Sequence, residues 1–493
     1  MVIVKGNNGK ALRRRRMMHG ILCLGSTVCL LVGFTILVNL FFLVVLDDPR
    51  GWSFFGFGSS HRARMRGYRQ HHQKKGFFFN GRNDDATDDA PHLSEEEILQ
   101  LILEGNLQLI DLMPNAANLH ALGGRDAPDY EGLYRGIFCR IDWTVHEEDP
   151  SSTPMFRDVI HSSECGQGNP TYQYDLYQAV QAVKAYDAQL PSLSHNNKTH
   201  STATVHTLEL GGVVFHESRC GSTLVANLMQ LHNPQENIVY SESPPPIHIL
   251  RFADSTEDEP MLNANLAATM LQDVIHLMSR SKDPAKKRVF FKIQSIGSLS
   301  IPTFRQAFPE TPWIFVYRNP TEVLMSHLKA GERANCVQTR TRAIPQRIHD
   351  TIQRSSLGDV DPLSLDIPQY CAAHLATLTE VAARELLADK EAHGLAVNYR
   401  DLPGIFMDHI LPDQWSIPVD EAARQRMHEG SSSYSKGRGP NAGMTFKSDT
   451  EEKQKEASAE VNRAAKDLLE PSFHTLEILA NIFKKTKGIA SSQ

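Results

Sequence analysis

The sequence predicts an α/β fold, with a parallel sheet flanked by helices, preceded by one transmembrane helix and a small accessory region. Two observations predict it. From about residue 205, short apolar runs alternate with stretches of helical periodicity, which is the pattern of a parallel sheet wrapped by helices. Near the N-terminus, an uncharged segment long enough to cross a membrane precedes a stretch without sustained periodicity.

The composition is that of a folded protein rather than a disordered one. The 493 residues suggest several domain-sized units, and 41% hydrophobic with 22% charged residues suffices for a packed core. A formal net charge of −6 gives no indication of nucleic-acid binding. Seven cysteines are too few for a disulfide scaffold, and no CxxC pair suggests zinc. Collagen, repeat arrays, multi-pass membrane proteins and small secreted toxins are therefore excluded.

The N-terminal segment predicts a membrane anchor. Residues 1–18 are expected to be a cytosolic tail and residues 19–46 a transmembrane signal anchor, because Gly20 to Leu46 is uncharged and a helix of that length would run roughly 40 Å. A buried helix and a cleaved signal peptide are the alternatives, and the length of the run counts against both. The basic cluster before it favours a cytosolic N-terminus. We therefore expect a single-pass type II protein of the Golgi membrane, with most of the chain in the lumen.

Three further parts are expected beyond the anchor: a stem over residues 47–92, an accessory luminal region over 93–204 and the main domain over 205–487. The stem passes from Gly/Phe-rich to basic to acidic sequence without a period. The sequon that begins at Asn197 is consistent with a luminal glycoprotein.

The accessory region is expected to begin with a helix. Ser94 and the three glutamates after it have the character of a helix start, and apolar residues continue at helical spacing; these are Ile98, Leu101, Ile102 and Leu109. Cys139 and Cys165 follow, and in an oxidising lumen they are candidates for a disulfide.

The main domain contains five strand candidates and a long C-terminal helix. The strand candidates are Gly212–Phe215, Ile238–Tyr240, Val289–Ile293, Trp313–Tyr317 and Leu395–Tyr399. Between them Leu262, Leu266, Met270 and Val274 repeat every four residues, as in a helix. The stretch from about Thr450 to Lys487 has a helical pattern that breaks at Pro471.

The turn after the first strand candidate predicts an anion site. Residues 211–230 read GGVVFHESRCGSTLVANLMQ, a buried strand, a glycine-bearing turn and a helix, where free backbone N–H groups and the helix dipole converge. Gly221 permits close approach, Ser222 and Thr223 offer hydroxyls, and Arg219 adds a positive charge. The turn is P-loop-like without the Walker lysine, which disfavours ATP or GTP hydrolysis. An ordinary strand–helix turn is the alternative.

A second phosphate site is predicted after Trp313–Tyr317. Arg318 stands at the carboxyl end of this strand, Asn319 suits a helix cap with Pro320 at the first helical position, and Ser326 falls on the second turn of that helix. An arginine and a hydroxyl so placed suit a second phosphate near the first. Taken alone, Arg318 paired with a surface carboxylate is the simpler reading.

Together the two segments resemble the sulfotransferase superfamily that uses 3′-phosphoadenosine-5′-phosphosulfate (PAPS). The 5′-phosphosulfate loop of its Golgi branch, R-x-G-[ST]-[ST], is similar to Arg219-Cys220-Gly221-Ser222-Thr223. The family's 3′-phosphate motif, strand–Arg–x₇–Ser–helix, is similar to Arg318 through Ser326. The resemblance covers about residues 205 to 485, and the tyrosylprotein sulfotransferase branch is nearest in motif layout. Cys220 replaces a commoner small residue and is expected to pack beneath the loop.

The resemblance also implies the catalytic residues. The branch has a catalytic glutamate in a turn after the first helix and a lysine upstream of the 3′-phosphate arginine, and these positions look like Glu242 and Lys292 here. The turn continues as three prolines rather than as in the branch, so the identity of the acceptor does not transfer. A late loop around Ser435 is similar to one that closes over the nucleotide.

These residues receive roles from the chemistry of sulfuryl transfer. Glu242 is the candidate base for the acceptor hydroxyl, with His216 and His248 as substitutes, although His216 is expected to pack locally at its strand end. Lys292 and Arg219 would neutralise charge on the leaving phosphate oxygen. The 3′-phosphate is assigned to Arg318 and Ser326, and the 5′-phosphosulfate to the first loop. No metal is expected.

The predicted function is a membrane-anchored PAPS-dependent sulfotransferase acting on a hydroxyl of a glycan or protein. Two alternatives stay open: a nucleotide kinase on a related fold, against which the missing lysine counts, and a non-catalytic nucleotide- or glycan-binding pseudoenzyme that binds without turnover. The oligomeric state is not predicted. A run of arginines suits either an acidic acceptor or a solvated helix face; these are Arg340, Arg342, Arg347 and Arg354.

Overall fold

The computed structural model describes residues 93–115, 129–194, 205–253, 262–331, 334–340 and 344–489, all of which belong to one compact unit, Thr87–Gln493. The predicted anchor, the stem and the sequon at Asn197 lie outside the described residues. Among the helices of the described ranges, none combines the length and the apolar character that a membrane crossing requires.

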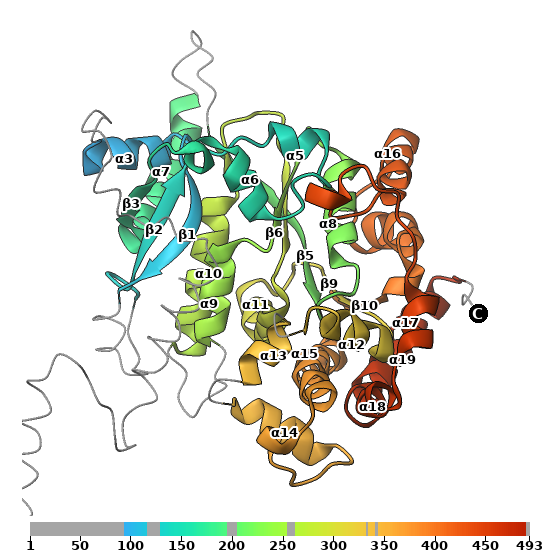
Figure 1. Cartoon of the computed structure of the whole chain (residues 1–493). Helices are drawn as coiled ribbons and strands as arrows, with labels where there is room; N and C mark the ends of the chain where they lie inside the picture. Colours follow the sequence, from blue (N-terminus) through green and yellow to red (C-terminus); the bar gives the residue numbers. More distant parts are fainter. Residues whose placement is uncertain are drawn as a thin grey trace, which may run out of the picture. The chain divides into compact units, whose positions relative to one another are not determined.

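A five-stranded parallel sheet forms the centre of the fold (Figure 1). Its strands are β5 (Glu209–His216), β6 (Asn237–Ser241), β8 (Arg288–Lys292), β9 (Trp313–Tyr317) and β10 (Gly394–Asn398). Each predicted strand is present, which confirms the α/β class. The spatial order is β10-β9-β5-β8-β6, so the chain leaves the central strand β5 first to one side and later to the other. Ligands of such sheets bind at the carboxyl edge where the strand order reverses, which is the end of β5.

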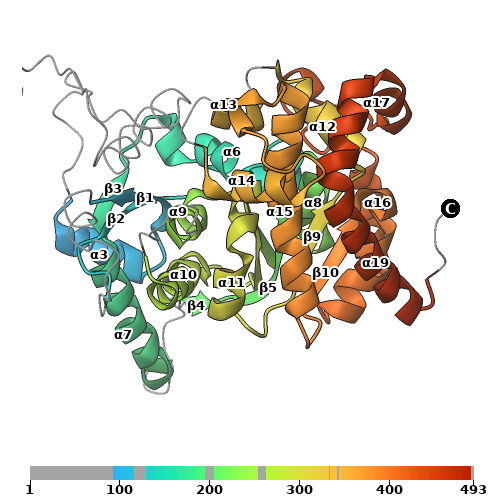
Figure 2. The same ribbon diagram turned by 90° about the horizontal axis from the view of Figure 1, so that it is seen from below.

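Helices cover both faces of the sheet because the strands are apolar on both sides. Alternate residues such as Phe215, Phe291 and Phe315 point into one hydrophobic core, and Val214, Phe290 and Val316 point into another. The first core is closed by α9 (Pro244–Ala253), α10 (Ala264–Met278), α11 (Ile301–Ala307), α15 (Ile367–Ala388) and α19 (Glu470–Thr486). Figure 2 shows α9, α10 and α11 lying together.

The opposite face is covered by fewer elements. The second core is closed by α8 (Ser222–His232), a π-helical segment over Phe406–Gln414 and α16 (Glu421–Ser431). Short 3₁₀ turns follow two of the strands, Ser295–Ser300 after β8 and Tyr399–Asp401 after β10. Two others lie between helices, Pro362–Ser364 before α15 and Gly439–Asn441 after α16. A small antiparallel ribbon, β4 (His206–Thr207) with β7 (Arg280–Ser281), flanks the entry to β5.

The accessory region folds onto the first core rather than forming a core of its own. Its antiparallel sheet has the order β1-β2-β3 and lies beside α9 and α10 in Figure 1. Its strands are β1 (Gln108–Pro114), β2 (Tyr134–Cys139) and β3 (Tyr172–Asp175), and its helices are α3 (Glu95–Leu103), α5 (Thr144–Glu148), α6 (Phe156–Ser162), the 3₁₀ turn Glu164–Gln167 and α7 (Leu176–Ser194). The candidate disulfide between Cys139 and Cys165 is formed.

The first helix of this region is shorter than expected. Ser94 caps α3 in a capping box with Glu97, which confirms the predicted start. Leu109 was predicted to continue this helix and instead lies in β1, so that assignment is wrong. The reason is Gly105, whose φ of 66° takes the chain out of the helix just after Leu103.

The segments after β9 build a third hydrophobic cluster against α15. They are α12 (Pro320–Leu328), α13 (Asn335–Arg340), α14 (Gln346–Arg354), α18 (Ala459–Ala464) and a π-helical segment over Ala465–Leu469. The polar helix α17 (Thr450–Glu456) lies against α12 and adds no side chain to this cluster. A second disulfide, between Cys336 and Cys371, joins α13 to α15 and was not predicted.

The C-terminal helical stretch is interrupted earlier than predicted. The chain leaves the helix at Ala457, and Ser458 caps α18 with its side chain. Pro471, where the break was expected, stands in the first turn of α19, directly after the π-helical segment Ala465–Leu469.

Candidate active site

The turn between β5 and α8 has the geometry of an anion-binding loop. Ser218, Arg219 and Gly221 all have positive φ, at 84°, 56° and 86°, so the backbone curls tightly before α8 begins at Ser222. Only glycine fits at position 221, because a Cβ there would collide with the ring of Tyr399. The Leu224 N–H donates to the Gly221 carbonyl at 2.9 Å, and a helix N-terminus at such a turn is suited to an anion.

The loop rests on a buried layer that joins it to β9. The Cys220 thiol donates to the Val316 carbonyl at 3.0 Å, and burial raises the pKa of this thiol to about 12. Cys220 therefore packs beneath the loop, as predicted, and is unreactive. The Glu217 carboxylate accepts from the Arg318 N–H at 2.5 Å, and burial raises the pKa of Glu217 well above its usual range. Glu217 thus connects the first loop to the second predicted site.

Glu242 and Lys292 meet across two neighbouring strands. The register of β6 and β8 sets Ser241 opposite Lys292, and the Glu242 N–H donates to the Lys292 carbonyl at 2.7 Å. The Lys292 ammonium then donates to Glu242 Oε1. Glu242 has a φ of 57°, a conformation that is uncommon outside glycine and that clusters at functional sites.

Most of the charged groups around the Glu242–Lys292 pair are cations. Burial raises the pKa of Glu242, but the charges around it, that of Lys292 first among them, outweigh that effect and hold it at about 2. Lys436 belongs to the same cluster: burial, together with Lys292, lowers its pKa to about 8. Arg219 is exposed at the mouth of the loop and acts electrostatically on Lys436. Within the described part of the chain, Glu242 is the one acid that these cations surround.

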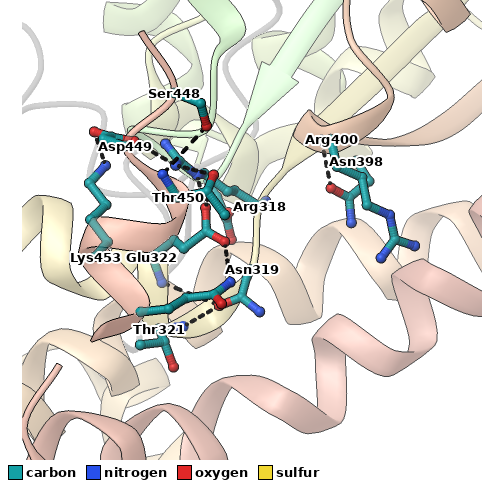
Figure 3. A network of polar contacts seen from close by, with 12 residues as sticks. Arg318, Asn319, Thr321, Glu322, Asn398, Arg400, Ser448, Asp449, Thr450 and Lys453 are labelled. Atoms are coloured by element: carbon teal, nitrogen blue, oxygen red, sulfur yellow. Dashed lines mark hydrogen bonds and ion pairs between the residues drawn. The ribbon is translucent and has the colours of Figure 1, made fainter. Parts of the chain in front are cut away.

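Arg318 lies in a network of acids beside a cavity (Figure 3). Its Nε donates to Glu322 at 2.6 Å, and one terminal nitrogen donates to Asp449 at 2.8 Å and to Thr450 at 3.3 Å. The guanidinium stands 4.4 Å from the centre of the Tyr399 ring. Both carboxylates thus form ion pairs with the Arg318 guanidinium. The Glu322 side chain is buried, whereas the Asp449 side chain is exposed to solvent.

The cavity has a volume of about 560 Å³, which is within the range of small-molecule sites. Its walls combine aromatic, amide and hydroxyl groups, and they include Arg318, Asn319, Tyr399, Phe446, Ser448 and Thr450. Leu224 of α8 also lines it, so the cavity adjoins the helix that follows the turn after β5. Figure 3 shows Asn398 and Arg400 on the side away from Glu322.

The remaining predicted residues are placed less directly. Asn319 caps α12 and Pro320 stands in its first turn, both as predicted. Ser326 lies one turn beyond Glu322 on α12 and is absent from the cavity wall formed by the described residues. The Ser435 carbonyl accepts from Asn227 of α8 at 3.0 Å.

The late loop is anchored on both sides of the site. Besides the bond from α8 to Ser435, Arg438 forms an ion pair with Asp158 of α6 in the accessory region. Lys436, between these two anchors, interacts with Glu242 and Lys292. The loop therefore contributes to the site through Lys436 more directly than through Ser435.

The two substitute bases have different surroundings. His248 Nε2 lies 2.8 Å from Asp111 of β1, which ties α9 to the accessory sheet. His216 was expected to pack locally, yet its Nε2 lies 3.9 Å from Glu242 Oε1. His216 is therefore part of the cluster around Glu242.

Sequence reasoning missed Tyr399, Glu322 and Asp449. Tyr399 follows β10 directly, and the rule that sites form at the carboxyl ends of parallel strands is the signal that would have found it. Glu322 stands four residues after Arg318 in a helix, a spacing that pairs charges. Asp449 is 131 residues from Arg318 and has no local signal.

A group of potential metal ligands lies elsewhere. Glu310, Glu391 and His393 gather on the surface, and in the described ranges they are the one such group. They precede β9 and β10, at the sheet edge opposite the turn between β5 and α8.

No family model matches the chain, and no curated protein matches it. Among solved structures, it is similar to the sulfotransferase domain of the Synechococcus PCC 7002 olefin synthase, with 15% identity, a TM-score of 0.32, and coverage of 56% of this chain and 96% of that one. It is also similar to the sulfotransferase domain from the curacin biosynthetic pathway, with 13% identity, a TM-score of 0.31, and coverage of 53% and 98%. For sulfotransferase STF9 from Mycobacterium avium, the identity is 12%, the TM-score 0.28, and the coverage 50% and 71%. At this level of identity and overlap, none of them assigns an activity to this chain.

The Glu242–Lys292 pair predicts a specific pH dependence of stability. The pKa of Glu242 is about 2 in the folded chain, below its unfolded value, so its contribution is present above about pH 4.5 and is lost as pH falls toward 2. Between pH 5 and pH 3 the free energy of unfolding should fall by about 1–2 kcal/mol more in the natural chain than in Glu242→Gln, as measured by urea denaturation. Equal losses in the two proteins would mean that the carboxylate is not held by the cations.

Proposed function

We propose that this protein is a PAPS-dependent sulfotransferase that transfers a sulfuryl group to a hydroxyl of a glycan or protein acceptor, anchored in the Golgi membrane through residues 19–46. The observation that carries the proposal is the cluster at the end of β5. Three cations, Arg219, Lys292 and Lys436, converge beside a helix N-terminus, and one carboxylate stands among them. This arrangement suits an anionic group that is transferred to a nucleophile.

The cavity beside Arg318 supports a nucleotide as the rest of the donor. Tyr399 connects the two sites, because its ring contacts Arg318 and also closes against Gly221 of the phosphate loop. A donor with its 5′-phosphosulfate at the loop and its 3′-phosphate at Arg318 would extend from one of these sites to the other. The incoming phosphate would replace the exposed Asp449 as the partner of the guanidinium.

The ion pair gives Lys292 and Glu242 linked roles. A carboxylate with a pKa near 2 is a weak base at neutral pH. If Lys292 turns toward the leaving phosphate oxygen, Glu242 loses its strongest cation and its pKa rises. Glu242 then removes the acceptor proton, while Lys292 balances the negative charge that develops as the S–O bond to the phosphate breaks.

Two other functions are less well supported. A kinase would use a lysine within the turn and acidic magnesium ligands, whereas the turn here holds Arg219 and no lysine. A pseudoenzyme would bind the same nucleotide without needing a carboxylate at the transfer point, yet Glu242 is held there in an uncommon backbone conformation.

Replacing the base should separate binding from turnover. Glu242→Gln should keep the affinity for adenosine 3′,5′-bisphosphate within a few-fold and lower the rate of ³⁵S transfer from labelled PAPS by about 10²–10⁴-fold. The assay uses the full chain in detergent with a panel of chondroitin, heparan and an acidic tyrosyl peptide. Glu236→Gln is the matched control. Glu236 directly precedes β6, at the end of the strand opposite to Glu242, and forms an ion pair with Lys287. Activity retained in Glu242→Gln would place the base elsewhere.

Arg318 should distinguish nucleotides by their 3′-phosphate. Arg318→Ala should weaken adenosine 3′,5′-bisphosphate by about 10–100-fold and leave adenosine 5′-monophosphate within about 3-fold, as measured by calorimetry. Asp449→Asn should have the opposite effect and strengthen the bisphosphate several-fold, because a competing carboxylate is removed from Arg318. Equal losses of both nucleotides in Arg318→Ala would remove this arginine from the 3′-phosphate site.

Lys436 should make nucleotide binding depend on pH in the alkaline range. Its pKa is lowered to about 8, so it is protonated and attracts anions below pH 8 and loses its charge above it. The affinity for adenosine 3′,5′-bisphosphate should therefore decline from pH 8 to pH 9.5, and Lys436→Arg should show no such decline because arginine stays charged. A flat profile in the natural chain would exclude Lys436 from the anion site.

A further inference from the structure

His216 is fixed at the carboxyl end of β5 by contacts to its backbone and to its ring. The Ser298 hydroxyl accepts from the His216 N–H at 3.2 Å and donates to the His216 carbonyl at 3.1 Å. The Ser218 N–H donates to His216 Nδ1 at 3.0 Å. The residue is buried, with 4% of its surface exposed. The ring is therefore held rigidly before any ligand binds.

These contacts determine which ring nitrogen carries the proton. Because Nδ1 accepts a hydrogen bond from a backbone N–H, the neutral ring must carry its proton on Nε2. Burial and the nearby Lys292 lower the pKa of His216 well below its usual range, so the ring is neutral. Nε2 is buried and makes no well-formed hydrogen bond among the described residues, although the Ile293 backbone interacts with the ring and acts to raise its pKa. A buried donor without a partner is costly and calls for an explanation.

The direction of this donor supplies the explanation. Nε2 lies 3.9 Å from Glu242 Oε1, the same oxygen that accepts from Lys292. The charged groups around both residues are Lys292 from β8 and Lys436 from the late loop. In this structure the Lys292 ammonium donates to Glu242 Oε1, and His216 Nε2 lies just beyond hydrogen-bond distance from that oxygen.

We propose that His216 is a positioning residue that takes over Glu242 Oε1 when Lys292 turns to the leaving group. The proposal rests on the proposed sulfuryl transfer and concerns how the base is held during it. As the acceptor oxygen bonds to sulfur, its proton passes to Glu242, and the electron pair of the broken S–O bond goes to the phosphate beside Lys292. His216 donates a hydrogen bond through Nε2 and transfers no proton.

A neutral donor suits this role better than a second cation. Lys292 orients Glu242 but holds its pKa at about 2, which suppresses its basicity. A neutral N–H keeps the carboxylate in place and stabilises its charge far less. The base would therefore stay oriented at the moment when it becomes able to accept a proton.

Two substitutions separate the donor from the rest of the ring. His216→Asn retains an acceptor oxygen for the Ser218 N–H and lacks the Nε2 donor, whereas His216→Gln supplies an amide N–H at the Nε2 position. In the full chain, with the panel acceptor that the natural chain sulfates, kcat should fall about 10–100-fold in His216→Asn and recover most of that loss in His216→Gln. The affinity for adenosine 3′,5′-bisphosphate should stay within about 3-fold in both.

The pH profile tests positioning against a purely structural role. Without the hydrogen bond to its charged form, Glu242 should have a higher pKa in the donor complex, so the acid limb of kcat should move up by about one pH unit in His216→Asn and stay in place in His216→Gln. His232→Asn is the control, since this buried histidine bonds to the Pro418 carbonyl and should affect stability only. An unmoved limb in His216→Asn would overturn the proposal.

A stability measurement tests the same exchange without any activity. In Lys292→Met, Glu242 Oε1 no longer accepts a hydrogen bond from an ammonium group, so His216 Nε2 should donate to it. His216→Asn should then lower Tm by about 2 °C or more beyond its effect in the natural background. Equal effects in both backgrounds would overturn the proposal even if transfer is observed. A chain that shows the larger effect but transfers no sulfuryl group to any acceptor would keep the exchange and refute the proposed function instead. If Lys292→Met does not fold, the kcat values and pH profiles of His216→Asn and His216→Gln decide.

Discussion

The ion pair between Lys292 and Glu242 is the interaction on which the arrangement of the site depends. It forms because β6 and β8 are neighbours in register, so that two residues 50 positions apart meet at one edge of the sheet. It gives the buried Lys292 side chain a partner and holds Glu242, which has an uncommon backbone conformation. The strand order then adds His216 from β5 on the other side of β8, and Arg318 from β9 next to it. The chemistry of the site is therefore a property of the sheet order.

The protein's own carboxylates balance the cations of this charge-rich site. Glu242 balances Lys292, and Asp449 with Glu322 balances Arg318, so each predicted anion position already holds a carboxylate. A dianionic group entering either position exchanges one anion for another rather than neutralising a bare cation, which moderates the electrostatic gain. The exposed Asp449 is the easier of the two partners of Arg318 to displace.

The fold and the central residues were predictable because they follow short-range rules. Apolar runs gave all five strands, and the glycine-bearing turn gave the loop before α8. The second disulfide, Tyr399 and Asp449 depend on contacts between distant segments, which periodicity does not encode. The apolar spacing that continues to Leu109 predicted a longer helix. The helix ends before Leu109 because Gly105 has a positive φ. Neither the pairing of Glu242 with Lys292 nor the tautomer of His216 is visible before the strands are placed.

The most direct test of the central claim is calorimetric titration of the full chain in detergent with adenosine 3′,5′-bisphosphate and, separately, with ATP–magnesium. A site in which Arg318 receives a 3′-phosphate and the loop after β5 a sulfonate should bind the bisphosphate at micromolar or lower concentration and bind ATP–magnesium weakly or not at all. Binding of ATP–magnesium in preference to the bisphosphate would favour a kinase. Binding of neither by a folded chain would contradict the account of the donor site altogether.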